Sequence, residues 1–461
     1  MSSLSLPYIL MFLPLSIAIL ARWRRPWALA CLSALFYLLV DWRAFPSFLL
    51  SLGLNYSLAG SISRETSPPI RLRKLWLGLF ANVLWLFSYK LVASGWDLVA
   101  EAPGESPLAP IGLSFYTIQQ IMVLVDSYQG VWVQPARLDY WNFVAFFPQV
   151  VAGPIPRPSD TLEQHLGFSS NLPRWDDCAA GLFVFSFGLF KKVVLADSLA
   201  MLVDPGYAQV EGLRVLDAWV VAVGYYLQIF LDFSGYSDMA LGAGLMLGIR
   251  LPINFERPYR CSSLVRFWSE WHMSLTAFIT NYVYFSLARL KGRRVSFSWA
   301  MTATWLSMVI CGLWHGLTVM FLLWGAMHGF GLVAHHLWHR RRGGLPRLAA
   351  LALTQVFVIL SFVLFRSPDL TTCSRMLGNL AGWAGTKTIL WGDRFDTFDS
   401  AIISSSFVLG AAVAFLAPST RQLLEDFKPG RSQLLVTTVA FLLGCLFLCS
   451  SRGVSFIYAH F

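Results

Sequence analysis

The sequence predicts an all-α polytopic membrane protein, folded as a single transmembrane domain over residues 1–461. Of its 461 residues, 56% are hydrophobic and only 13% are charged, whereas soluble domains carry about 25% charged residues. The mean hydropathy is +0.58. Apolar runs recur along the chain, at about the 20 residues that a bilayer-crossing helix needs. This composition excludes a soluble enzyme, a disordered chain and a disulfide scaffold, because a soluble fold could not bury so much apolar surface.

The positive charge is distributed as in a membrane protein. The chain has 35 Lys and Arg against 25 Asp and Glu, a formal net charge of +10. These basic residues lie in short patches between apolar runs, where the positive-inside rule places them, so we expect no nucleic-acid partner. The seven cysteines are scattered without a CxxC pair. We therefore expect neither a disulfide framework nor a zinc ribbon. Cys311 and His315 are spaced i, i+4, as in a metal pair on a helix, but no further ligands lie near them in the sequence, so we expect no metal site.

About eleven membrane-spanning helices are expected. The first run, residues 4–21, is followed by Arg22, Arg24 and Arg25, which fits an uncleaved anchor with its N-terminus outside. Residues 107–128 and 250–290 are too interrupted for simple spans, so we expect re-entrant or interfacial helices there. The other candidate spans begin near residues 27, 45, 75, 139, 177, 215, 297, 317, 347, 400 and 432.

The loops between these runs predict the orientation. Residues 22–25 and 64–74 are basic and should be cytoplasmic, whereas residues 96–109 carry only acidic charges and should be outside. The basic runs at 289–294 and 340–342 also indicate the cytoplasm. The two apolar segments between them should therefore form a hairpin that enters from the cytoplasm and returns.

Residues 232–272 do not fit a simple span or a free loop. They hold too many polar groups for lipid exposure and too many aromatic residues for a free loop. Irregular backbone at membrane depth is tolerated only where protein or water covers it, so this segment should line a cavity or lie in the interface. The alternative is an amphipathic surface helix, with Leu264, Phe267, Trp268 and Trp271 on one side, that only anchors the protein.

Histidines in apolar surroundings are the candidates for chemistry. His315 lies in a run, from about residue 297 to 337, whose ionisable residues are histidines and Cys311. A neutral imidazole there can take a proton from a hydroxyl and return it, as a general base does. The alternative is a histidine that only bonds a neighbouring helix. His272, where the polar stretch re-enters an apolar helix, could orient substrate or stabilise charge, or could be an interfacial anchor.

His328, the missing motifs and the C-terminal tail limit the possible functions further. His328 lies 13 residues after His315, about 20 Å along a continuous helix, so the two could share one centre only if the chain turns near Gly316. We expect His328 to be structural. The absence of GxSxG and nucleotide-binding motifs argues against a hydrolase and a nucleotide-driven pump. The aromatic tail at 451–461 could anchor at the interface or insert the Tyr458 hydroxyl into the protein's own cavity.

Eight short stretches resemble the membrane-bound O-acyltransferase (MBOAT) family, in family order. The resemblance is to the bacterial branch with the alginate O-acetylation and teichoic-acid D-alanyl transfer proteins. It covers a motif-bearing core of about residues 110–330. The stretches are PIGLSFYTIQQ (110–120), FPQVVAGPI (147–155), GLFKK (188–192), DFSGYSD (232–238), LPINFERPY (251–259), FWSEWHMSL (267–275), GLWHG (312–316) and LWGAMHG (323–329).

The resemblance implies a fold and roles for single residues. It implies helices ringing a central funnel, with His315 as catalytic base and His272 as the second histidine. The ending FIYAHF at 456–461 is similar to the FxYxxF terminus of a partner peptide in teichoic-acid D-alanylation, which implies that Tyr458 accepts the acyl group transiently. Thr280 and Asn281 depart from the family's usual charged pair. The expected substrate-binding residues in the matched stretches are Asp238, Asn254, Trp271 and Trp314.

The function that follows is a bacterial inner-membrane O-acyltransferase. It would move an acyl group, with acetyl favoured, from a cytoplasmic thioester across the membrane to O-acetylate an exported polysaccharide, alginate or cellulose. The expected donor is acetyl-CoA, with no bound cofactor. The expected partners are membrane lipid and a periplasmic polysaccharide O-acetyltransferase. The alternatives are D-alanyl transfer to teichoic acid and a secondary transporter in which Asp232, Asp238 and the histidines form an ion path.

Overall fold

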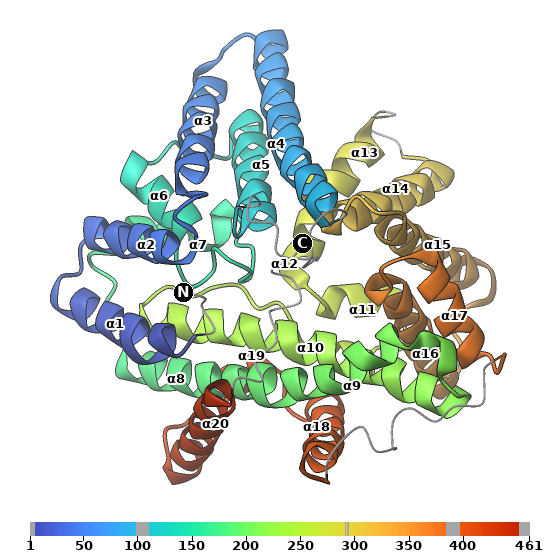
Figure 1. Ribbon diagram of the computed structural model, residues 1–461. Helices are drawn as coiled ribbons and strands as arrows, with labels where there is room; N and C mark the ends of the chain where they lie inside the picture. Colours follow the sequence, from blue (N-terminus) through green and yellow to red (C-terminus); the bar gives the residue numbers. More distant parts are fainter. Residues whose placement is uncertain (1–4, 98–109, 291, 293–294, 384–396, 451–461) are drawn as a thin grey trace.

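The computed structural model describes residues 5–97, 110–290, 292, 295–383 and 397–450. Within these ranges the chain is helical and contains no strand, which confirms the predicted all-α class. Three groups of helices make up the molecule (Figure 1): an N-terminal group, a central pair of long helical segments, and a C-terminal group that carries His272, His315 and His328.

The N-terminal group runs to residue 166. Proline in the first turn starts α2, α3 and α7, where its missing N–H has no intrahelical partner to lose. Helix α5 is flanked by Gly112 and Gly130, both left-handed with φ near +75°. The elements are η1 (Tyr8–Phe12), α1 (Leu13–Arg22), α2 (Pro26–Asp41), α3 (Phe45–Arg64), α4 (Pro68–Asp97), α5 (Leu113–Gln129), α6 (Arg137–Ala145) and α7 (Pro158–Leu166).

The central pair forms the middle of the molecule (Figure 1). Helices α8, η2 and α9 follow one another without a break, and α10 returns antiparallel beside them. Most of α10 is buried. The elements are α8 (Trp175–Leu189), η2 (Phe190–Ala196), α9 (Asp197–Ala208), η3 (Val210–Gly212) and α10 (Val215–Met246).

The C-terminal group begins with short helices and continues with long ones. In Figure 1, α14 to α17 lie at one end of α10, whereas α18 and α20 project from the opposite side of α8 and α9. The elements are η4 (Pro258–Arg260), α11 (Leu264–Glu270), α12 (Met273–Phe278), η5 (Ile279–Tyr284), α13 (Phe285–Arg289), α14 (Phe297–His315), α15 (Val319–Arg342), α16 (Arg347–Arg366), α17 (Leu370–Leu380), α18 (Thr397–Phe415), α19 (Thr420–Glu425) and α20 (Arg431–Cys449).

Seven of the described helical segments are long and apolar enough to cross a membrane, which makes this a polytopic membrane protein. Two shorter apolar segments, Tyr8–Arg22 and Pro26–Asp41, add to them. The sequence predicted about eleven spans. The seven are Pro68–Val92, Trp175–Ala208, Val215–Met246, Phe297–His315, Arg347–Arg366, Thr397–Phe415 and Arg431–Cys449.

One predicted span is wrong. The apolar run from about residue 139 contains only α6, nine residues long, which ends before Phe146. Pro148 and Pro154 prevent the helix from continuing. The run is apolar because other helices bury it, not because it faces lipid: Phe143, Phe146 and neighbouring residues are at most a few per cent exposed.

The interrupted regions behave differently from each other. Residues 250–290 are broken into η4, α11, α12, η5 and α13, as predicted. The alternative of a surface helix that only anchors the protein is wrong, because Leu264, Phe267, Trp268 and Trp271 are all buried within the protein. By contrast, most of the described part of 107–128 lies in one buried helix of 17 residues, α5, which runs from Leu113 to Gln129.

Candidate functional site

His315 lies at the tip of a helical hairpin. Helix α14 ends at His315, the chain turns through Gly316, and Thr318 caps the start of α15. The two helices approach closely at Gly312 and Gly325, because a Cβ on Gly325 would lie only 2.4 Å from the Met308 carbonyl oxygen. The run that the sequence presents as continuous therefore breaks directly after the candidate base.

The hairpin brings two histidines to one tryptophan. The ring of Trp324 on α15 lies 5.2 Å from the imidazole of His315 and 4.9 Å from that of His328, measured between centroids. His315 and His328 could lie near one centre only if the chain turned near Gly316, and that turn is present. Trp314 and Phe365 also contact His315, at 4.7 and 5.2 Å. His315 is thus enclosed by aromatic rings and is 3% exposed.

His328 has a structural arrangement. The Trp268 indole N–H donates to its Nδ1 at 3.3 Å, and its Nε2 lies 3.0 Å from the Ser361 hydroxyl. Since Nδ1 accepts, Nε2 carries the proton and donates to Ser361. With both nitrogens engaged between α11, α15 and α16, His328 holds these helices together, as expected for a structural histidine.

His272 is held in a strained backbone conformation. Its φ of 43° makes it the one non-glycine residue with positive φ among the described residues. It precedes α12, and its ring lies 4.6 Å from Phe233 and 6.3 Å from Trp314. A left-handed conformation costs a residue with a Cβ about 1–2 kcal/mol. The indole of Trp314 thus contacts both imidazoles, His272 and His315, which come from separate elements.

Asn254 positions the backbone that follows His272. Its carbonyl oxygen accepts the Met273 N–H at 2.9 Å, and its side-chain oxygen accepts the Ser274 hydroxyl at 2.7 Å. Its amide donates to Ser237 on α10 at 3.3 Å. The structure therefore gives this predicted substrate-binding residue a clear role in holding the loop.

The other predicted substrate-binding residues separate into two places. Trp314 lies between the histidines, with its indole N–H 3.4 Å from the Ser114 carbonyl oxygen. Trp271 stacks on Phe267 at 5.5 Å. Asp238 pairs with Lys191 at 2.7 Å and accepts the Thr420 hydroxyl at 2.8 Å. Only Trp314 joins the histidines directly, and Tyr458 lies outside the described residues.

The buried carboxylates of α10 are neutralised by lysines of η2. Asp232 lies 2.8 Å from Lys192, which also pairs with Asp197 at 2.5 Å, while Asp238 pairs with Lys191. Buried charges are stable only when paired in this way. These contacts join the two central helical segments. They give Asp232 and Asp238, the carboxylates of the ion path in the transporter alternative, a structural role as ion-pair partners of lysines.

Lys90 is a residue of the site that sequence reasoning missed. Its Nζ, buried at the end of the apolar part of α4, donates to the carbonyl oxygens of Trp314 and His315, the latter at 3.1 Å. Carbonyls at a helix C-terminus lack intrahelical partners and carry partial negative charge. Lys90 therefore fixes the end of α14 that bears the imidazole. The signal was present, since Lys90 is the one charged residue between Lys74 and Asp97.

A pocket of about 440 Å³ lies along α14 and extends as far as Cys311. We call it the α14 pocket. Side chains of α11, α12, η5, α14 and α15 line it, and the lining includes Trp268, Thr276, Thr280, Ser307, Cys311 and His336. Cys311 lies one helical turn before His315, and His336 lies beside the basic end of α15. Among the described residues, no group of three or more His, Cys, Asp or Glu could hold a metal ion.

Comparison with known proteins identifies the family of this chain. The sequence profile of the MBOAT, membrane-bound O-acyltransferase family matches residues 73–365. The peptidoglycan O-acetyltransferase of Helicobacter pylori is 31% identical over 93% of this chain and 90% of its own length.

Two other kinds of relative are similar over less of the chain. The probable alginate O-acetylase AlgI of Pseudomonas aeruginosa is 36% identical over 70% of this chain, and the match spans 62% of that relative. The teichoic acid D-alanyltransferase of Streptococcus thermophilus is 28% identical over 57% of this chain and 70% of its own length. The chain belongs to the membrane-bound O-acyltransferase family and is an acyltransferase.

Proposed function

We propose that this protein moves an acetyl group from a cytoplasmic thioester to a hydroxyl acceptor, for O-acetylation of an exported polysaccharide. The observation that carries the proposal is the α14 pocket, which reaches Cys311, one turn from the enclosed imidazole of His315. Relatives named for peptidoglycan and alginate O-acetylation support a polysaccharide as the final acceptor. Their bacterial origin supports placement in the bacterial inner membrane.

The proposed chemistry uses His315 as general base. The acceptor hydroxyl gives its proton to the imidazole while its oxygen bonds to the carbonyl carbon of the thioester. The C–S bond then breaks, and the imidazolium returns the proton to the thiolate sulfur, so that an ester and a free thiol result. Lys90 holds the backbone of His315 during these steps, and Trp314 keeps His272 in contact with the same centre.

The donor in this proposal is acetyl-CoA, entering the α14 pocket from the side of His336. That side carries the basic run at 340–342, which favours an anionic donor. Tyr458 is the proposed transient acceptor, which passes the acetyl group to a periplasmic polysaccharide O-acetyltransferase. Alginate, peptidoglycan and cellulose are the candidate polymers.

Labelled acetyl-CoA and protein in lipid nanodiscs test this proposal. We expect acetyl label on the Tyr458 peptide, measured by mass spectrometry, and its loss by at least about 100-fold in His315→Ala, since general-base catalysis contributes about 10²–10⁴-fold. Glu163→Gln, an exposed acid of α7, is the control and should keep the label. Labelling that survives His315→Ala would contradict the role of His315.

D-alanyl transfer is the second candidate, favoured by the similarity to a teichoic acid D-alanyltransferase. The same nanodiscs, supplied with a D-alanyl thioester on a carrier protein, separate the two donors. Faster transfer from that thioester than from acetyl-CoA would replace acetyl by D-alanyl in the proposal.

A further inference from the structure

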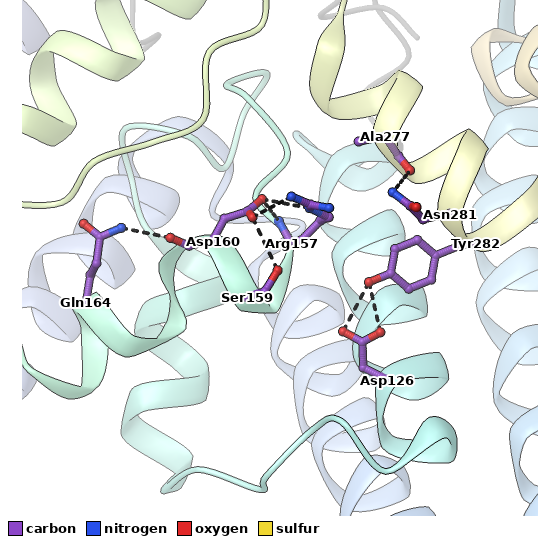
Figure 2. A network of polar contacts seen from close by, with 8 residues as sticks. All are labelled: Asp126, Arg157, Ser159, Asp160, Gln164, Ala277, Asn281 and Tyr282. Carbon is purple, nitrogen blue, oxygen red and sulfur yellow. Dashed lines mark hydrogen bonds and ion pairs between the residues drawn. The ribbon is translucent and has the colours of Figure 1, made fainter. Parts of the chain in front are cut away.

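The far end of α5 makes a polar contact with the wall of the α14 pocket. The Tyr282 hydroxyl, on η5, donates to both carboxylate oxygens of Asp126, at 2.9 and 3.2 Å. Figure 2 shows the phenol directed at the carboxylate across the gap between the two helices. The contact joins segments that are 156 residues apart in the chain.

The α5 side of this contact is firmly held. The Asp126 carbonyl oxygen accepts the N–H groups of Val131 and Trp132, at 3.0 and 3.2 Å. Arg71 of α4 donates to the adjacent Ser127 carbonyl oxygen at 2.8 Å. These bonds close the end of α5, so Asp126 offers a fixed acceptor.

The η5 side belongs to the pocket. Thr280 and Tyr284, which flank Tyr282 by two residues on each side, line the α14 pocket. The segment is π-helical and follows α12, which begins directly after the strained His272. Short π-helical segments occur frequently at functional sites. Tyr282 is thus the point at which the pocket wall is attached to α5.

Polar neighbours of this contact bond other groups instead of the Tyr282 hydroxyl. Arg157 pairs with Asp160 through two bonds, at 3.2 and 3.0 Å, and Asn281 donates to the Ala277 carbonyl oxygen at 2.9 Å (Figure 2). Burial raises the pKa of Asp126 from 3.8 to about 6, although the Tyr282 hydrogen bond and the charge of Arg157 both oppose this shift. Asp126 is therefore ionised at pH 7.5 despite its burial, so that its bond with Tyr282 is charge-assisted.

We propose that Asp126 and Tyr282 are positioning residues that hold η5 against α5, so that Thr280 and Tyr284 keep the α14 pocket in the shape that binds the thioester donor. Neither residue touches the reacting atoms in this arrangement. The inference rests on the proposed function and adds to it a determinant of donor binding.

The principal test is Tyr282→Phe, which removes one hydroxyl and keeps the ring. Loss of a hydrogen bond to a charged group should raise KM for the donor by at least about tenfold, while kcat changes by less than about twofold. Amide hydrogen exchange in residues 273–284 should become faster. Glu163→Gln, an exposed acid of α7, should match the wild type in all three measurements.

The pH dependence gives a second, independent measurement. Asp126 is ionised above pH 6 and protonated below it, so the wild-type KM should rise as the pH falls from 7.5 to 5. In Asp126→Asn, which keeps the shape and one acceptor oxygen, KM should already be raised about threefold at pH 7.5 and stay constant over this range. The double variant should be no worse than Tyr282→Phe alone, because both changes remove one contact.

Stability separates a positioning role from a merely structural one. The raised pKa means that the folded state favours the protonated carboxyl, so the contribution of Asp126 to stability decreases as the pH rises from 3.8 to about 6. Asp126→Asn should therefore melt no lower than the wild type at pH 7.5, although it binds donor less well. A parallel loss of melting temperature and donor binding would overturn the inference.

Different results would overturn the role of Asp126 and Tyr282 and the proposed acyl transfer. Wild-type protein that transfers no acyl group from either thioester overturns the proposed function, and hydrogen exchange then still measures whether the contact holds residues 273–284. Tyr282→Phe with wild-type KM and wild-type exchange overturns the inference while the function stands.

Discussion

Single residues of the site are held by their surroundings more than by their own helices. His315 is the last residue of α14, yet Lys90 of α4 fixes its carbonyl, and Trp324 of α15 and Phe365 of α16 pack on its ring. His272 is held by the loop bonds of Asn254. Both imidazoles thus depend on residues far away in the chain.

The strained backbone of His272 leads to a prediction that separates its side chain from its conformation. Glycine adopts positive φ without penalty, whereas alanine does not. We expect the free energy of unfolding of His272→Gly to exceed that of His272→Ala by about 1 kcal/mol. At most other positions in a folded chain, the glycine variant would be the less stable of the two. Thermal unfolding in detergent would measure this difference.

Acyl transfer in the same two variants then reports on the imidazole. Both should lose most of the activity, because each lacks the ring that contacts Trp314. A His272→Gly variant as active as the wild type would show that the imidazole has no part in the chemistry.

At the scale of elements, the α14–α15 hairpin is defined by close backbone contact. Gly325 faces the Met308 carbonyl oxygen and the Gly312 Cα, so a methyl group there would meet backbone that cannot move aside easily. We expect Gly325→Ala to destabilise the protein by about 1–3 kcal/mol, seen as a lower midpoint of thermal unfolding.

Gly53→Ala on α3 is the matched control for this substitution. A Cβ at Gly53 would meet no atom within 4 Å, and alanine favours a helix over glycine by about 1 kcal/mol. This variant should be as stable as the wild type or more stable. If both variants behaved alike, the close approach of α14 and α15 would not be a determinant of stability.

Elements also show where an apolar pattern misleads. The run near residue 139 has the hydropathy of a span but contains only α6, whereas α5, interrupted by Ser, Thr and Gln, is a continuous buried helix. Ser51, Asn55 and Gln120 explain the second case, because their side chains bond one another between α3 and α5. Hydropathy alone does not distinguish contact with lipid from contact with protein.

At the scale of the whole molecule, the basic loops predict which side each end of a helix faces. Residues 340–342 should be cytoplasmic and residues near 370 external, separated by the span α16. A cysteine at Arg341 should react with a membrane-impermeant maleimide only in inside-out vesicles, and a cysteine at Leu370 only in right-side-out vesicles.

The exposed native cysteines Cys31 and Cys449 would first be changed to serine, and that background variant is the control. Labelling of both engineered positions from the same side would contradict the orientation. It would also remove the basis for a donor that enters the α14 pocket beside His336.

The sequence by itself determined the class of the molecule, most of its long helices, and the histidines to consider, because apolar runs, basic loops and short motifs are local properties of the chain. It could not give the position of α6, the ion pairs of Asp232 and Asp238, or the contacts of Lys90 and Tyr282 with distant segments. The tertiary structure decided these, since in a membrane protein a polar side chain acquires its role from the partner that neutralises or bonds it, and that partner lies on another helix. For the same reason, the surroundings of His315 depend on the tertiary structure: the chain turns after His315, and Trp324, Phe365 and Lys90 from three other helices lie around it.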